Sequence, residues 1–311
     1  MTGAGPDSHE AEHVSLYPNL ITIGAMKAGT TLLHSLLGRH REIHASPVKE
    51  PNFFCRPNRH RLRDGYHALF DPAARYNLES SISYARAPRA PWVPAEIAAV
   101  RPDARLIYLV RDPVDRMISQ HAEAIDQFRE HRPLRDYLRE TRDNPERPLE
   151  TSLYAYQLDR FLEHFPANQI HVMVYEQLVQ DPAQELRRLG GFLDVQGLET
   201  LGTGLPVVNS GRTKRGHNAL GRFLASRAVG RWLATSPRVP WRLREGVKAC
   251  GRIGAPPYKR DALDEETELG LIEQMRPDVR RLEAFLGQPI DAWPRFHDGE
   301  EAAVSSVRRA A

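Results

Sequence analysis

Residues 19–39 read NLITIGAMKAGTTLLHSLLGR, and the succession of elements in this stretch predicts the architecture of the chain. Leu20 to Ile23 is a short apolar run rich in β-branched residues, which is typical of a buried strand. Leucines at positions 32, 33, 36 and 37 recur at helical spacing, so we expect a helix to begin near residues 29–31. A strand that leads through a glycine turn into a helix predicts an α/β fold.

The turn between that strand and helix has the properties of an anion site. Its glycines allow the backbone to approach a ligand closely. The N–H groups that open a helix have no intrahelical partner and lie at the positive end of the helix dipole. We therefore expect the turn to hold a phosphate; the alternative is a glycine-rich turn that binds nothing. The candidate binding residues are Lys27, Ala28, Gly29, Thr30 and Thr31.

The turn is not a Walker A loop. In that pattern, GxxxxGK[ST], the lysine directly follows the second glycine. Here Thr30 occupies that position and Lys27 lies two residues before Gly29. A kinase with an atypical phosphate loop is therefore the less favoured alternative. The pattern GxxKxGTT resembles the 5′-phosphosulfate loop of sulfotransferases, which use 3′-phosphoadenosine 5′-phosphosulfate (PAPS).

The composition is that of a folded globular protein. The chain has 311 residues, of which 41% are hydrophobic, and its net charge of +3 gives no global signature of nucleic-acid binding. Two cysteines, Cys55 and Cys250, form neither a disulfide framework nor a zinc pattern. No apolar run approaches the ~20 residues that span a bilayer. We expect a cytoplasmic protein whose residues 1–15 are disordered.

A second motif, KEPNFF at residues 49–54, follows a brief predicted strand at 43–45. Ligands of open α/β sheets bind at the carboxyl ends of the strands, where such loops gather. The segment resembles KEPxFF of carbohydrate-type sulfotransferases, and the resemblance implies that Glu50 is the general base. His44 is a rival base, because it is near in sequence and histidine is a common general base. In the next strand, which begins at Tyr76, Ser80 follows Glu79 where some glycan sulfotransferases carry lysine.

A third motif follows the apolar strand RLIYLV at residues 105–110. Arg111 stands at the strand end, and Ser119 lies about two turns into the next helix. A guanidinium and a hydroxyl can jointly hold a second phosphate. The arrangement resembles the 3′-phosphate motif of sulfotransferases, an arginine followed eight residues later by serine. The alternative is a capped helix with an ordinary surface ion pair.

The three motifs in this order resemble PAPS-dependent sulfotransferases, in particular bacterial members of the carbohydrate or heparan type. The resemblance implies a three-layer α/β fold with a central, mostly parallel sheet, helices on both faces and a P-loop-NTPase-like topology. We expect one sulfotransferase domain over residues 16–296 and a disordered tail at 297–311. Residues 59–70, 95–100, 152–165 and 183–193 are expected helices, 87–94 a proline-rich loop and 169–175 a strand. Tyr154 is either a contact of the adenine or a core aromatic.

Residues 212–260 contain 13 lysines and arginines and a single acid, Glu245. Three interpretations compete: a solvated helical face, a membrane or nucleic-acid patch, and a lid over an anionic cofactor. The resemblance favours the lid for Arg212, Lys214, Arg215 and Gly216, which match the family's basic late loop loosely. The helices of 217–252 are left as a solvated or substrate-facing surface, and two more helices are expected within 265–286.

The resemblance also implies a chemistry. An acceptor hydroxyl attacks sulfur in line, and Lys27 stabilises the charge that grows on the departing 5′-phosphate. Glu50 takes the acceptor proton. The expected acceptor is a sugar or a small-molecule natural product; neither a nucleic acid nor a metal ion is expected. The remaining alternative is a non-catalytic nucleotide-binding protein.

Overall fold

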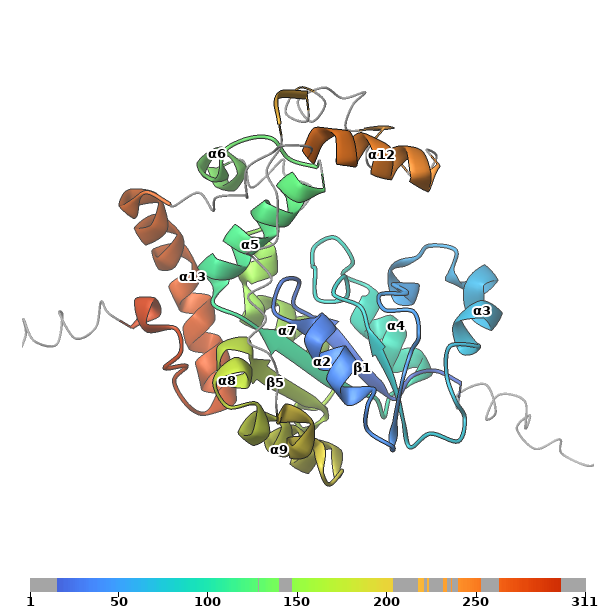
Figure 1. Cartoon of the computed structure of the whole chain (residues 1–311). Coiled ribbons are helices and arrows are strands. Elements are labelled where there is room, and N and C mark those ends of the chain that lie inside the picture. Colours follow the sequence, from blue (N-terminus) through green and yellow to red (C-terminus); the bar gives the residue numbers. More distant parts are fainter. Residues whose placement is uncertain are drawn as a thin grey trace, which may run out of the picture. The chain divides into compact units, whose positions relative to one another are not determined.

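The fold is known from a computed structural model, which describes residues 16–127, 129–139, 147–203, 240–252 and 263–297, with 218–220, 223, 232–233 and 236 between them. A five-stranded sheet forms its centre (Figure 1). The strands are β1 (Leu20–Gly24), β2 (Ile43–Ala45), β3 (Tyr76–Ser80), β4 (Arg105–Val110) and β5 (Ile170–Val174).

All strand pairs of this sheet are parallel, and the order is β2-β3-β1-β4-β5. The chain leaves β1, builds β2 and β3 on one side of it, and then crosses to build β4 and β5 on the other. The end of β1 is therefore the topological switch point, where open α/β sheets bind their ligands. The predicted α/β class with a parallel sheet is confirmed.

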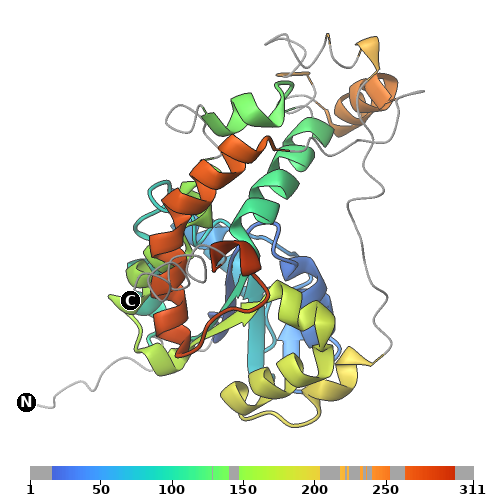
Figure 2. The same cartoon turned by 90° about the vertical axis from the view of Figure 1, so that its left-hand side faces the viewer.

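The central strands are covered on both faces. Every residue of β1 is buried, and so is β4 apart from its first residue, Arg105. This explains why both strands are continuous apolar runs and show no alternation. α2 (Thr30–Leu37), α8 (Tyr175–Gln180) and α9 (Pro182–Leu193) lie on one side of the sheet (Figures 1 and 2). α4 (Val93–Val100), α7 (Tyr154–Leu162) and the part of α13 (Glu265–Leu286) from Met275 onward lie on the other.

Three predicted boundaries are corrected. α4 begins at Val93 and not at Ala95, because Pro94 occupies the first turn, where its missing N–H costs nothing. Residues 59–70 form two short helices, η2 (Arg59–Leu62) and α3 (Arg63–His67), and not one. Residues 265–286 form a single helix that contains Pro277, and not two helices. Buried side chains at helical spacing on both sides of that proline keep the helix continuous: Ile272, Met275, Val279 and Leu282.

The remaining short elements are η1 (Phe53–Cys55), η3 (Glu150–Ser152), η4 (Ala167–Gln169), η5 (Leu198–Gly202) and η7 (Pro294–Phe296). Residue contacts divide the chain into two compact units. The first contains the sheet and consists of residues 1–113, 150–205 and 275–311. The second consists of 114–149 and 206–274, and its described elements are α5 (Pro113–Asp126, from Val114), α6 (Leu134–Arg139), α12 (Trp241–Arg252) and the start of α13.

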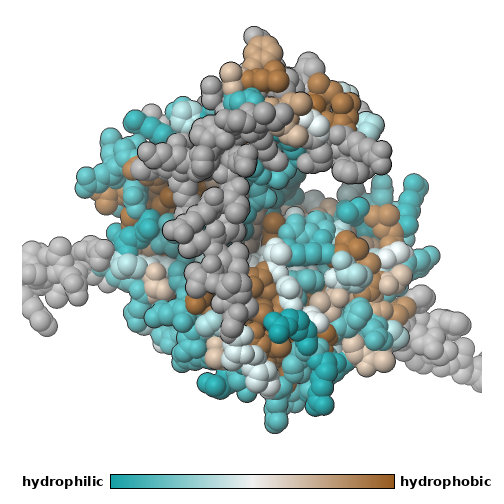
Figure 3. Space-filling view, viewed as in Figure 1, coloured by the Kyte–Doolittle hydropathy of each residue, from teal (hydrophilic) through white to brown (hydrophobic). Residues whose placement is uncertain are grey.

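Inside the second unit, the side chain of Arg116 is fully buried and donates hydrogen bonds to Gln120 and to the carbonyl oxygen of Pro148. Among the described residues, no helix is both long and apolar enough to cross a bilayer. Several large apolar side chains of this unit are nevertheless exposed: Leu220, Phe223, Trp232 and Leu243. Figure 3 shows the hydropathy of one face of the molecule, with hydrophobic residues in brown and hydrophilic ones in teal.

Candidate active site

The turn after β1 presents unengaged backbone donors. Lys27 has a left-handed backbone (φ 69°), and so does Gly29 (φ 92°), which precedes the first residue of α2. Within the part of the chain that the structure describes, no acceptor is hydrogen-bonded to the N–H groups of Gly29, Thr30 or Thr31. These donors lie at the positive end of the α2 dipole, so the turn has the chemistry of a phosphate cradle.

The aromatic ring of Tyr175 packs against the backbone of this turn. A Cβ atom added to Gly29 would lie 2.7 Å from Cδ2 of Tyr175, so the ring packs directly against the glycine backbone. Tyr175 opens α8, immediately after β5. The sequence analysis assigned neither Tyr175 nor Glu176 to the site, because nothing local in the sequence indicates that this pair lies beside the phosphate turn.

Arg111 joins the two predicted phosphate motifs. Its Nη1 donates a hydrogen bond to the carbonyl oxygen of Lys27 at 3.3 Å, and its guanidinium carbon lies 5.2 Å from the centre of the Tyr175 ring. The strand-end arginine predicted for a 3′-phosphate and the lysine turn predicted for a 5′-phosphate are therefore neighbours. Tyr175 lies against both, so the three groups form one site.

Glu176 holds the Arg111 segment in place. Its Oε1 accepts the backbone N–H of Asp112 at 3.1 Å and lies 3.9 Å from Nε of Arg111, while its Oε2 accepts Nε1–H of Trp293 at 3.0 Å. Arg295 adds an ion pair to the carboxylate of Asp112 at 3.2 Å. Residues close to the end of the described chain thus support the phosphate site, a role that the sequence did not indicate.

Tyr154 is completely buried, between the rings of Tyr108 and Trp293. Its hydroxyl donates to the carbonyl oxygen of Arg111 at 2.7 Å and accepts the N–H of the same residue at 3.4 Å. This placement favours the alternative of a core aromatic over an adenine contact. Tyr154 fixes the backbone of Arg111 from inside the fold.

Glu50 lies at the same edge of the sheet as Lys27. Its N–H donates to the carbonyl oxygen of Ser80, the last residue of β3, and β3 is the direct neighbour of β1. The side chain is about one-third exposed (35%), and Oε1 pairs with Nζ of Lys49 at 2.6 Å. A partly exposed carboxylate beside the end of β1 has the position and the chemistry of a general base.

The structure separates Glu50 from its rival. His44 pairs with Asn77 in the sheet, whereas Glu50 is bonded to Ser80. Asn77 comes three residues before Ser80 in β3, so at the usual rise of a strand His44 lies about 10 Å nearer the amino ends of the strands. Its Nε2 is bonded to the carbonyl oxygen of Leu69. This placement favours Glu50 as the base.

Ser80 itself faces inward. It is completely buried, and its Oγ lies 2.8 Å from Nδ1 of His34 on α2. Nε2 of His34 lies 3.1 Å from the carbonyl oxygen of Ser46, so Nε2 carries the proton and Ser80 donates to Nδ1. Burial lowers the pKa of His34 below its usual value. In this chain Ser80 therefore ties β3 to α2.

The remaining predicted cofactor residues are Ser119, Arg212, Lys214, Arg215 and Gly216. Ser119 is a buried residue of α5 in the second unit. Arg212, Lys214, Arg215 and Gly216 lie outside the described residues, so their part in a lid remains a prediction. Among the described residues, no group of three or more His, Cys, Asp and Glu side chains is arranged to hold a metal ion.

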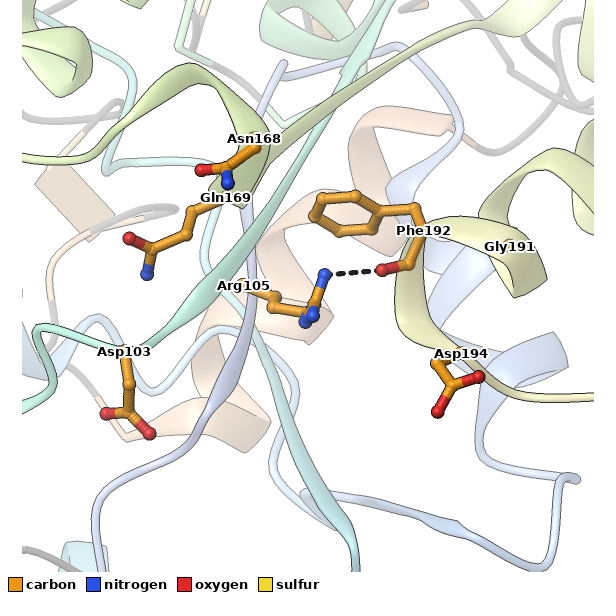
Figure 4. Close-up of a pocket in the computed structure, with 7 residues that line it drawn as sticks. All are labelled: Asp103, Arg105, Asn168, Gln169, Gly191, Phe192 and Asp194. Carbon is orange, nitrogen blue, oxygen red and sulfur yellow. Dashed lines mark hydrogen bonds between the residues drawn. The ribbon is translucent and has the colours of Figure 1, made fainter.

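A surface pocket of about 580 Å³ lies at the other edge of the sheet, by the amino ends of β4 and β5 (Figure 4). Its polar side chains are engaged within the protein. Arg105 donates to the carbonyl oxygen of Phe192, Gln169 donates to those of Pro102 and Ala104, and Asp194 pairs with Arg75. The pocket therefore offers few free groups to a ligand, and the candidate active site remains at the carboxyl edge.

Comparison with known proteins identifies the family. The sequence pattern described as "Sulfotransferase domain" matches residues 17–202, which contain the phosphate turn, Glu50, Arg111 and Glu176. The chain therefore belongs to the sulfotransferase family. The membership in the sulfotransferase family that three short motifs predicted is confirmed.

Two heparan sulfate sulfotransferases are among the similar proteins of known function. Heparan sulfate glucosamine 3-O-sulfotransferase 3A1 of Mus musculus is 32% identical over 220 residues, which are 64% of this chain and 54% of the relative. The 3B1 enzyme of the same organism is 33% identical over 59% of this chain and 47% of its own length. The chain thus spans about half the length of these relatives.

A solved structure agrees with the fold. The crystal structure of a sulfotransferase from Alicyclobacillus acidocaldarius has a TM-score of 0.61 and 22% identity, and the match covers 89% of this chain and 98% of that one. At this identity the likeness supports the fold alone.

Proposed function

We propose that this protein transfers a sulfuryl group from PAPS to a hydroxyl of a sugar. The observation that carries the proposal is the hydrogen bond between Arg111 and the Lys27 carbonyl oxygen, which joins two anion-binding motifs into one site. A donor with phosphates at both its 3′ and 5′ positions matches two such motifs. The family match supports the same donor.

Each residue then has a defined task. The N–H groups of Gly29 to Thr31 bind the 5′-phosphate, and Arg111, with Ser119 as its proposed partner, binds the 3′-phosphate. Glu50 accepts the proton of the acceptor hydroxyl as its oxygen bonds to sulfur. The bond between sulfur and the bridging oxygen breaks, and Lys27 stabilises the charge left on adenosine 3′,5′-bisphosphate.

The acceptor is proposed from the relatives. Their names specify a glucosamine unit of heparan sulfate, so a glucosamine-containing glycan is the first candidate and a hydroxylated natural product the second. A cytoplasmic location remains a prediction. Arg212, Lys214, Arg215 and Gly216 are proposed to close over the donor.

The test is a transfer assay with radiolabelled PAPS and a panel of heparan sulfate, chitobiose and glucosamine. We expect label in at least one acceptor and none with Glu50→Gln, whose amide cannot take the proton. Thermal unfolding in the presence of ligand separates the alternatives. Protection by adenosine 3′,5′-bisphosphate supports the proposal, whereas protection by Mg-ATP alone supports a kinase. Binding of the bisphosphate without transfer to any acceptor would leave a non-catalytic nucleotide-binding protein.

A further inference from the structure

The segment that carries Glu50 has an unfavourable backbone. Glu50 (φ 62°) and Asn52 (φ 51°) both adopt the left-handed conformation, although neither is glycine. Such residues persist only where the surroundings fix them. What holds this segment therefore also determines where the proposed base lies.

A buried carboxylate lies directly behind the segment. Glu79, in β3, has no exposed surface and accepts three hydroxyl hydrogen bonds. Its Oε1 accepts from Ser81 at 2.5 Å and from Tyr84 at 2.7 Å, and its Oε2 accepts from Tyr66 at 2.5 Å. Burial is the main cause of its raised pKa, and the three donors oppose that rise.

Two of the three hydroxyls reach onward to the segment. Oγ of Ser81 accepts the backbone N–H of Asn52 at 3.0 Å, and the hydroxyl of Tyr84 accepts that of Phe54 at 3.3 Å. Because both hydroxyls donate their protons to Glu79, their oxygen lone pairs are available to accept the backbone N–H groups of the segment. Hydrogen bonds in such chains also strengthen one another.

We propose that Glu79 is a positioning residue, which fixes the Glu50 segment through Ser81 and Tyr84. The inference rests on the proposed function, in which Glu50 is the base. A buried carboxylate is costly compared with an apolar side chain of similar size. The proposed role explains why a carboxylate is buried beneath the segment: by accepting the hydroxyl protons of Ser81 and Tyr84, Glu79 orients the oxygens of both hydroxyls toward the backbone N–H groups of the segment.

Tyr66 provides a matched control. Its hydroxyl binds Glu79 as the other two do, but among the described residues it contacts no backbone group of the segment. Its ring stacks on Phe53 at 3.9 Å, a contact that phenylalanine keeps. Tyr66→Phe and Tyr84→Phe therefore each remove one hydroxyl that donates to the Glu79 carboxylate, but only Tyr84→Phe also removes a hydrogen bond to the backbone of the segment.

Glu79→Gln is the conservative variant. Its amide oxygen can accept from Ser81 and Tyr84 as Oε1 does, while its amide nitrogen donates to the hydroxyl oxygen of Tyr66. Glu79→Ala leaves three buried hydroxyls without an acceptor, which endangers folding. The informative variants are thus Ser81→Ala and Tyr84→Phe, with Tyr66→Phe and Glu79→Gln beside them.

The first measurement is hydrogen exchange of the peptide covering residues 50–55, which needs no acceptor. We expect exchange to be about 10-fold faster in Ser81→Ala and Tyr84→Phe, and within about 2-fold of wild type in Tyr66→Phe. The second is transfer to the best acceptor of the panel, with kcat scaled to the fraction of protein that binds adenosine 3′,5′-bisphosphate. We expect kcat to fall at least about 10-fold in Ser81→Ala and Tyr84→Phe, while the KM for PAPS stays within about 2-fold.

Activity within about 3-fold of wild type in Glu79→Gln supports positioning, whereas its loss would assign Glu79 a charge-dependent role and overturn the inference. Equal exchange or equal kcat in Tyr66→Phe and Tyr84→Phe would also overturn it. Failure of the proposed function looks different: the wild-type protein itself would transfer no label to any acceptor.

Discussion

Lys27 combines a left-handed backbone with a carbonyl oxygen that accepts from Arg111. Its neighbour Ala28 is fully buried, so the turn is anchored in the core, whereas Lys27 is half-buried. In the proposed reaction, this cation stabilises the departing phosphate more than the bound donor, which is the condition for a faster chemical step.

We expect Lys27→Ala to lower kcat about 10²–10³-fold, because the charge that develops on the leaving group loses its nearest proposed cation. The affinity for adenosine 3′,5′-bisphosphate should fall much less, since the N–H groups of the turn remain. Transfer assays and calorimetric titration measure the two quantities separately. Lys27→Arg, which retains a cation on a different shape, should recover part of the loss. Wild-type kcat in Lys27→Ala would remove this residue from the chemistry.

Sequence reasoning proposed those candidate site residues whose signal is local. Arg111 directly follows a strong strand signal, Lys27 lies a few residues after another, and Glu50 lies in a six-residue motif. Glu176 was missed because its partner, the N–H of Asp112, is 64 positions away. The proposed role of Glu79 was missed because Ser81 and Tyr84, which are near it in sequence, bind backbone groups that are 29 and 30 positions away from them.

At the scale of elements, the turn between β1 and α2 depends on Gly29. We expect Gly29→Ala to weaken bisphosphate binding at least about 10-fold and to cost roughly 1–3 kcal/mol of stability. The new Cβ would lie 2.7 Å from the Tyr175 ring on a backbone with φ 92°, so the ring that lies beside Arg111 must move. Thermal unfolding and calorimetry provide the measurements.

Gly191, in α9, is the matched control for that substitution. A Cβ atom there meets nothing within 4 Å, so Gly191→Ala should be neutral or stabilise the helix by up to about 1 kcal/mol. Equal bisphosphate affinity in the two alanine variants would show that the contact between the turn and Tyr175 is dispensable.

The junction of β5 and α8 carries a second prediction at this scale. Glu176→Gln leaves one acceptor oxygen for two donors, Asp112 N–H and Trp293 Nε1–H, and removes the charge opposite Arg111. We expect about 5–10-fold weaker bisphosphate binding and a stability loss of roughly 1–3 kcal/mol. Calorimetry should find no such change for Glu163→Gln, an exposed carboxylate after α7. Unchanged affinity in Glu176→Gln would mean that Arg111 is held by other contacts.

Elements were predicted well where their periodicity was strong and less well where proline was present. The strand at 105–110 has the predicted bounds, because a run of six residues with an apolar core has few alternatives. Residues 87–94 were expected to form a loop and 265–286 two helices, yet Pro94 lies in a first helical turn and Pro277 lies inside the single helix α13. Burial of the residues around Pro277 outweighs the lost hydrogen bond, and burial is not visible in a local pattern.

At the scale of the molecule, the site depends on residues beyond the family match. The match ends at residue 202, but Trp293 is fully buried against Tyr154 and reaches Glu176. Asp278 on α13 likewise accepts the N–H groups of Ala155 and Tyr156 at the start of α7. The parallel sheet could be expected from the motif order, whereas this closure by the late helix could not.

The stability of the whole fold should also depend on pH through His171 in β5. Burial, with the nearby charge of Arg188, lowers the pKa of this imidazole to about 4. Its buried Nε2 has no hydrogen-bond partner among the described residues, and its ring stacks on Phe192 at 5.1 Å. In the unfolded chain the imidazole of His171 has a pKa near 6.5. Between about pH 4 and pH 6.5 this imidazole is therefore mostly protonated in the unfolded chain and mostly neutral in the folded protein.

It follows that the contribution of His171 is fully present above about pH 6.5 and is lost as the pH falls toward 4. A shift of this size corresponds to at most about 3 kcal/mol of unfolding free energy. His171→Phe keeps the stacking and removes the titration. Urea unfolding at about pH 7.5 and pH 4.5 should show wild type losing roughly 2–3 kcal/mol more than this variant, whereas the exposed His164→Phe should follow wild type. Parallel curves for wild type and His171→Phe would mean that the imidazole is protonated in the folded protein at low pH and finds an acceptor there.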